Sequence, residues 1–132
     1  RSTLFPYTTL FRSPYSWREL MNRYVTNRES LAGLMIVMDA RRPLTDFDLQ
    51  MLDWTQSEAL TTHLLLTKAD KLSRSEAMTT LRQVQAKTAG VATAQLFSAV
   101  TKSGVDEARG WVLGTLIRAR KKGGQKKNPD GS

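Results

Sequence analysis

The sequence contains no cysteine, a single histidine and no long hydrophobic run. Without cysteine the chain has no disulfide bond, no thiolate metal site and no cysteine nucleophile, and a reducing compartment is permitted. The longest apolar runs, residues 34–38 and 64–66, are far shorter than the ~20 residues that a membrane-spanning helix needs. We therefore expect no contact with a membrane and a cytoplasmic location. A chain of 132 residues has room for one small domain.

Acidic residues are scarce at both ends of the chain. The net charge is +8, of which residues 1–13 contribute +2 and residues 118–132 contribute +5. Residues 14–117 hold 12 basic and 11 acidic side chains, so the body is nearly neutral. The basic character belongs to the ends, and we expect no DNA partner.

Residues 1–13 show neither helical nor strand periodicity, and they stop where a clear helix signal begins. The segment resembles the translation, in one reading frame, of a standard short-read sequencing adapter. We interpret it as a non-native segment and exclude it from reasoning about the fold. The alternative is a genuine N-terminal arm that docks on a surface through its three aromatic side chains, Phe5, Tyr7 and Phe11.

Residues 14–117 alternate between helical and strand patterns. Capping boxes pair a hydroxyl with a carboxylate three residues later, at Ser16 and Glu19 and again at Ser73 and Glu76. Together with the apolar periodicity they predict helices over residues 16–29, 45–59, 73–89 and 104–117. Continuous apolar runs predict buried strands at about residues 31–39, 62–67 and 93–98. This alternation indicates an α/β fold, in which helices cover both faces of a parallel sheet.

The last predicted helix carries an apolar stripe, formed by Val105, Ala108, Val112, Leu113, Leu116 and Ile117. From Arg118 onward the residues are mainly Arg, Lys, Gly, Gln, Asn and Pro, which bury too little apolar area to become ordered. The sequence thus predicts a domain over residues 14–117 and a basic, disordered tail over residues 118–132.

Polar residues follow each predicted strand, at residues 39–41, 67–70 and 98–99. Ligands of open parallel sheets bind beyond the carboxyl ends of the strands, so these positions are the candidate site. A carboxylate at Asp70 is suited to accept hydrogen bonds from the ring N1–H and the exocyclic amine of guanine, a pair of donors that adenine lacks. The aliphatic stem of Lys68 is suited to cover one face of the base.

The turn at Ser98 and Ala99 completes this candidate base site. Its backbone N–H is suited to the guanine carbonyl, and a small side chain there allows the base to approach. The simpler interpretation of Lys68 and Asp70 is an exposed turn with a charge pair. Asp39 also allows two interpretations, either a functional pair with Arg41 or a strand-end carboxylate bonded to loop amides.

His63 lies within a predicted strand. We expect it to be structural, because the sequence offers no metal-binding constellation for it to join.

Two short motifs carry a resemblance to a known family. Thr67-Lys68-Ala69-Asp70 resembles the guanine-specificity motif of P-loop GTPases, and Ser98-Ala99 resembles their second base-binding motif. Residues 38–44, with Asp46, Met51 and Trp54 after them, look more particularly like the EngB/YihA family of bacterial ribosome-biogenesis GTPases. The similarity runs from about residue 17 to about residue 116.

The resemblance implies a three-layer P-loop GTPase domain that binds GTP or GDP with Mg²⁺ and acts in ribosome assembly and in cell division and septation. It implies that Lys68 and Asp70 recognise the base, that Thr67 supports their loop, and that Ser98 and Ala99 close over the base. A ribosomal subunit or its RNA is the partner that the resemblance implies.

The sequence departs from the family in the residues that bind phosphate. It has no Gly-x-x-x-x-Gly-Lys-Ser/Thr loop, no switch threonine and no Asp-x-x-Gly segment. We therefore expect the C-terminal part of such a GTPase, without its N-terminal strands, its phosphate loop or its metal ligands, and without hydrolysis. Base contacts alone predict millimolar or weaker binding. The strand at residues 31–38 then becomes an unprotected edge, at which chains are expected to associate.

Two further interpretations remain open. In the first, the chain is a non-catalytic RNA-binding or ribosome-binding module, in which the basic tail makes the contacts and the α/β body presents it. In the second, the chain is the translation of a broken gene and has no function as written.

Overall fold

The computed structural model describes residues 19, 21, 22 and 31–126, with side chains as far as residue 122. The chain divides into two units, Arg1–Leu31 and Ala32–Ser132. The few described residues of the first unit before Leu31 are helical. Most of the helix predicted over residues 16–29, the whole of residues 1–13 and the end of the predicted tail lie outside the described residues. The fold set out below is that of the second unit.

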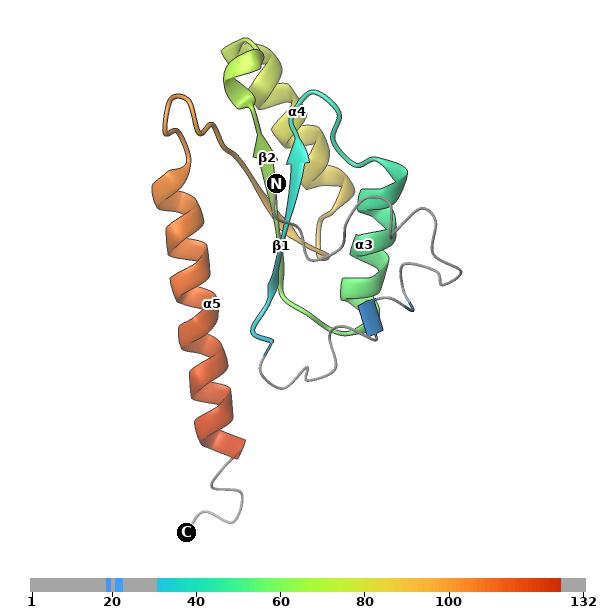
Figure 1. The fold of residues 1–132 in the computed structure, drawn as a ribbon, viewed down its shortest axis with the longest axis vertical. Coiled ribbons are helices and arrows are strands. Elements are labelled where there is room, and N and C mark those ends of the chain that lie inside the picture. Colours follow the sequence, from blue (N-terminus) through green and yellow to red (C-terminus); the bar gives the residue numbers. More distant parts are fainter. Residues whose placement is uncertain (1–18, 20, 23–30, 127–132) are drawn as a thin grey trace. The chain divides into compact units, whose positions relative to one another are not determined.

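Three parallel strands form the sheet of this unit, in the order β1-β2-β3 (Figure 1). They are β1 (Leu34–Asp39), β2 (Thr62–Thr67) and β3 (Thr93–Leu96). Strand β2 is central, with Leu64 opposite Ile36 on one side and opposite Ala94 on the other. The predicted parallel α/β fold is therefore confirmed.

Two of the strands are shorter than predicted, whereas β2 has its predicted bounds. The first begins at Leu34 rather than near residue 31, and the third ends at Leu96 rather than at residue 98. Beyond Leu96, the Phe97 amide still donates to the Leu66 carbonyl at 2.8 Å, but the Ser98 amide turns to the Ser103 carbonyl at 2.9 Å. The third strand ends because its backbone is engaged by its own loop.

The first two helices of the unit begin where their capping signals predict. Helix α3 (Asp46–Ser57) has Thr45 as its N-cap, and helix α4 (Arg74–Lys87) has Ser73 as its N-cap and Glu76 at the third position of its capping box. The Ser73 amide donates to Glu76 Oε1 at 3.0 Å, and the Glu76 amide donates to Ser73 Oγ at 3.1 Å. Between β2 and α4 lies a short 3₁₀ turn, η2 (Ala69–Lys71).

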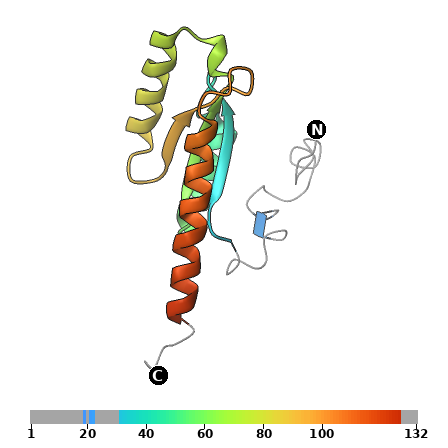
Figure 2. The ribbon, with the colours of Figure 1, turned by 90° about the vertical axis from the view of Figure 1, so that its left-hand side faces the viewer.

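The sheet lies between two layers of helices (Figure 1, Figure 2). Helices α3 and α4 cover one face, where the core consists of Ile36, Met38, Ala40, Leu52, Leu64, Leu66, Val84 and Ala94. Helix α5 (Val105–Lys126) covers the other face, where Trp111 stacks on His63 with 5.0 Å between ring centroids. The three-layer arrangement predicted from the sequence is thus present in the described part of the chain.

Helix α5 differs from the prediction in its length. It runs to Lys126, so residues 118–126 are helical and not part of a disordered tail. The reason is local, since arginine, lysine and glutamine are good helix formers and residues 105–128 contain no proline.

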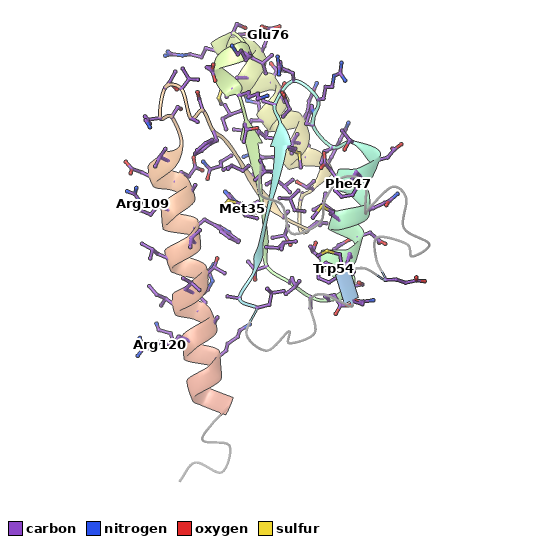
Figure 3. All side chains as sticks on the ribbon, in the orientation of Figure 1. Met35, Phe47, Trp54, Glu76, Arg109 and Arg120 are labelled. Carbon is purple, nitrogen blue, oxygen red and sulfur yellow. The ribbon has the colours of Figure 1, made fainter. Side chains whose placement is uncertain are left out.

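Helix α5 also differs in the face that it turns to the sheet. Trp111 and Thr115 lie on the sheet side, whereas Val112, Leu113, Leu116 and Ile117 of the predicted stripe are 41% to 55% exposed. Figure 3 shows Met35 of β1 on the side of the sheet that faces α5, with Arg109 and Arg120 pointing away from the sheet.

Strand β1 lies at one edge of the sheet within the described residues. Its Val37 side chain is 60% exposed, although it belongs to an apolar run. Among the described residues, β1 therefore pairs with β2 alone. Among the helices of the described residues, none is long and apolar enough to cross a membrane.

Candidate functional site

The carboxyl ends of β1 and β2 meet at one edge of the sheet (Figure 1). Asp39 and Thr67 are the last residues of these strands and lie opposite each other in the register. The Thr67 hydroxyl donates to the Met38 carbonyl at 3.1 Å, which ties the end of β2 to β1. This hydrogen bond fixes the position from which the loop after β2 begins.

The loop after β2 has an unusual backbone at Lys68. This residue has φ of 59° and ψ of 32°, in the left-handed region, and it forms the N-cap of η2. The Ala69 amide donates to the Phe97 carbonyl at 3.1 Å, so the loop is also tied to the chain that leaves β3. The strained conformation of Lys68 persists because hydrogen bonds fix the residues on either side of it, Thr67 and Ala69.

Asp70 and Ser98 are joined directly by a hydrogen bond. The Ser98 hydroxyl donates to Asp70 Oδ1 at 2.7 Å and accepts from the Thr101 amide at 3.2 Å. Ser98 is only 1% exposed, whereas Asp70 is exposed. A carboxylate accepts up to about four hydrogen bonds, so this contact orients Asp70 and leaves room for a ligand with two donors.

A cavity of about 560 Å³ opens beside this pair. Its polar lining residues are Asp70, Arg74, Ser98, Thr101 and Ser103, and its apolar ones include Ala77 and Met78 of α4. Neither Lys68 nor Ala99 lines this cavity. Ala99 is exposed at the turn that follows Ser98.

Asp39 binds both the backbone and the side chain of Arg41. The Arg41 amide donates to Oδ1 at 2.8 Å, and its guanidinium donates to Oδ1 at 3.0 Å and to Oδ2 at 2.7 Å. The ammonium group of Lys68 lies 4.0 Å from Oδ2 of the same carboxylate. Asp39 is therefore a strand-end carboxylate bonded to a loop amide, as the second interpretation expected, and it also forms an ion pair with Arg41.

This cluster shifts two pKa values. The hydrogen bond from the Arg41 side chain, followed by the one from its amide, holds the pKa of Asp39 well below its ordinary value of 3.8. The pKa of Arg41 is raised, mainly by its hydrogen bond to Asp39, with a smaller contribution from the charge of Asp70. Arg41 thus contributes positive charge beside both carboxylates at the edge of the sheet.

Asp39→Asn is expected to lower the free energy of unfolding near neutral pH. Because the folded-state pKa of Asp39 is depressed, its stabilisation is present above the ordinary value of 3.8 and is lost progressively as the pH falls below it. Urea unfolding at about pH 7 and about pH 3 should show a smaller difference between wild type and variant at the lower pH. An equal difference at both values would contradict the ion-pair argument.

The five site residues predicted from the sequence fall into two adjoining loops. Thr67 ends β2, and Lys68 and Asp70 lie in the loop that follows it. The hydrogen bond from Ser98 brings the loop of Ser98 and Ala99 against Asp70. His63 is buried with both ring nitrogens hydrogen-bonded. Within the described residues no group of three metal-ligating side chains occurs.

Sequence reasoning missed Gln95, which it treated as an ordinary strand residue. The Gln95 side chain is 1% exposed and donates to the Gly104 carbonyl at 2.8 Å. The signal available in the sequence was an uncharged polar side chain within an apolar strand, just before the loop that carries Ser98.

The chain is similar to several proteins named "Probable GTP-binding protein EngB", although no protein-family model matches it. It is 43% identical over 111 residues to the protein of Cupriavidus taiwanensis, covering 77% of this chain and 47% of the relative. It is 46% identical over 102 residues to the protein of Thiobacillus denitrificans, covering 73% of this chain and 50% of the relative. The chain therefore spans about half the length of the curated relatives it matches.

The fold is similar to that of a solved translation elongation factor. The translation elongation factor SelB of Methanococcus maripaludis matches with a TM-score of 0.64 in its apo form, at 20% sequence identity, covering 76% of this chain and 23% of that one. Its complex with the GTP analogue GppNHp matches with a TM-score of 0.60 at 23% identity, with the same coverage of both chains. The described unit is thus a partial α/β fold of the P-loop GTPase kind.

Proposed function

Because the chain matches part of an EngB-type GTP-binding protein, we propose that it binds guanine nucleotides through the two loops at the carboxyl edge of its sheet. The observation that carries the proposal is the 2.7 Å hydrogen bond from Ser98 to Asp70. It fixes a carboxylate beside the turn of Ser98 and Ala99, an arrangement suited to the two adjacent donors of a guanine base.

In the proposed complex, the loop after β2 and the loop after β3 each contact a different part of the base. Asp70 accepts from the guanine N1–H and the exocyclic amine, which selects guanine because adenine offers no such pair of donors. Lys68, directed by its left-handed backbone, covers one face of the base with its aliphatic stem. The Ala99 turn places a backbone N–H near the guanine carbonyl.

Asp70→Asn is expected to weaken GDP binding by about ten- to a hundredfold, because charged hydrogen bonds to the base are lost. It should also reduce the preference for GDP over ADP. NMR titration of the full 132-residue chain is the suitable measurement, since it detects millimolar affinities.

Two control variants accompany this titration. Asp106→Asn removes a carboxylate that is 98% exposed near the start of α5, and it should leave GDP binding unchanged. A chain that lacks residues 118–132 should also bind GDP normally. If the affinity for GDP depended on those residues and not on Asp70, the base-reading assignment would be wrong and the basic segment would be the binding element.

For a full-length protein that contains this chain, we propose GTP binding with Mg²⁺ in the cytoplasm and a role in ribosome assembly and cell division. The support is the similarity to EngB proteins over about half of their length. GTP hydrolysis by this chain is not expected, because its sequence has no phosphate-binding loop. Within the described residues, no group of three His, Asp or Glu side chains could hold a metal ion. The basic side chains at positions 118–122 of α5 suit contacts with RNA phosphates, which weaken as salt rises.

A further inference from the structure

A polar cluster lies buried between the sheet and α5. His63 and Gln95 are 3% and 1% exposed, and His63 stacks on Trp111. His63 Nδ1 lies 2.6 Å from Thr93 Oγ1, and its Nε2 lies 2.8 Å from Gln95 Oε1. Burying polar groups has a free-energy cost unless each finds a partner, and here they do.

The orientation of the Gln95 amide follows from its neighbours. Its nitrogen donates to two backbone carbonyls, Leu96 at 3.1 Å and Gly104 at 2.8 Å. The reverse orientation would set the amide oxygen against both carbonyl oxygens. The oxygen therefore accepts from His63, so Nε2 of His63 carries a proton.

The contact between Gln95 and Gly104 closes the loop of residues 98–104. Strand β3 ends at Leu96, and α5 begins directly after Gly104. The hydrogen bond from the Gln95 side chain to the Gly104 carbonyl joins the two ends of the segment between them. Gly104 has φ of +86°, and a Cβ there would lie 2.3 Å from the Leu96 carbonyl oxygen and 2.8 Å from Gln95 Nε2. The close approach that Gln95 needs is thus available only with glycine at this position.

The same loop holds Ser98 in contact with Asp70. Ser103, the neighbour of Gly104, accepts from the Ser98 amide at 2.9 Å, and the Ser98 hydroxyl donates to Asp70 at 2.7 Å. A continuous set of contacts therefore leads from Gln95 to the carboxylate at the edge of the sheet.

We propose that Gln95, held in orientation by His63, is a positioning residue for guanine binding: by binding the Gly104 carbonyl it closes the 98–104 loop and so sets Ser98 and Ala99 against Asp70. This inference rests on the proposed function. The ligand that it concerns is the base of a guanine nucleotide.

Gln95→Met tests this role, because methionine has a similar size but does not donate to the Gly104 carbonyl. We expect the Ser98 amide to exchange with solvent about tenfold faster without any nucleotide, and the affinity for GDP to fall about three- to tenfold. Amide hydrogen exchange and NMR titration with GDP and with ADP on the full chain measure both effects. The weaker binding of ADP should change little.

Thr93→Val is the matched control. It removes the hydrogen bond on the other side of His63 but leaves the contact between Gln95 and Gly104 in place. Its Ser98 exchange rate and GDP affinity should stay close to those of wild type. A merely structural role for the polar cluster would instead make the two variants alike.

The outcomes separate this inference from the proposed function. Unchanged Ser98 exchange in a folded Gln95→Met chain overturns the positioning role. If Gln95→Met does not fold, hydrogen exchange of the Gln95 side-chain amide in the wild-type chain is the deciding measurement. Exchange at the rate of a free amide also overturns the positioning role, and slower exchange supports it. If GDP causes no chemical-shift change in the wild-type chain, the proposed function is refuted, and with it any role of Gln95 in base binding. This holds even if hydrogen exchange shows that Gln95 closes the 98–104 loop.

Discussion

Leu64→Ala is expected to lower the free energy of unfolding by about 2–5 kcal/mol, the range for removing a large apolar side chain from a packed core. Leu64 is 0% exposed in the central strand, opposite Ile36 of β1 and Ala94 of β3, so no surface rearrangement fills the resulting cavity. A loss of this size is a large fraction of the stability of a small domain. Urea unfolding followed by circular dichroism measures it.

Leu49→Ala provides the comparison for this experiment. Leu49 lies on α3 and is 49% exposed, so the same chemical change there should cost less than about 1 kcal/mol. Similar losses at both positions would mean that β2 is not the centre of the folded unit, and the strand order would then need revision.

Gly104→Ala is expected to destabilise the chain by about 3 kcal/mol, because it combines a left-handed backbone with a steric clash. The added Cβ would meet the Leu96 carbonyl oxygen at 2.3 Å, and backbone atoms at this position have little freedom to move. The loop that carries Ser98 should shift as a result. The same urea experiment measures the loss, and the chemical shift of the Ser98 amide reports the displacement.

Gly90→Ala separates the two causes. Gly90 has φ of +79°, similar to that of Gly104, but a Cβ there meets no atom within 4 Å. Its substitution should therefore cost only the backbone preference, about 1–2 kcal/mol. Equal losses for the two variants would show that the left-handed backbone alone matters and that the contact with Leu96 does not.

The capping residues in the sequence predicted where α3 and α4 begin. The features that the sequence did not predict, such as the orientation of α5, depend mostly on tertiary contacts. The capping boxes involve neighbours along the chain, so Ser73 and Glu76 show the start of α4 before any packing is known. The orientation of α5 is different, because apolar side chains occur around much of its circumference. Periodicity alone does not decide that Trp111, which meets His63, faces the sheet while Leu113 and Ile117 remain exposed.

The candidate site was predictable to a similar extent. The carboxyl ends of parallel strands meet at one edge, which is enough to expect Asp70 near Ser98. The link from Gln95 to Gly104 crosses a loop and depends on a backbone conformation open to glycine, so strand periodicity does not reveal it. The same holds for the contact of Lys68 with Asp39, which depends on the left-handed backbone of Lys68.

The edge position of β1 affects how the chain behaves in solution. Natural edge strands are commonly protected by lysine, proline or a bulge, but β1 reads Leu-Met-Ile-Val-Met before its terminal aspartate. It has the composition of an interior strand, and the exposed Val37 lies on it. A second copy of the chain that pairs with this edge would stabilise the folded state by mass action, so we expect the apparent melting temperature to rise with protein concentration.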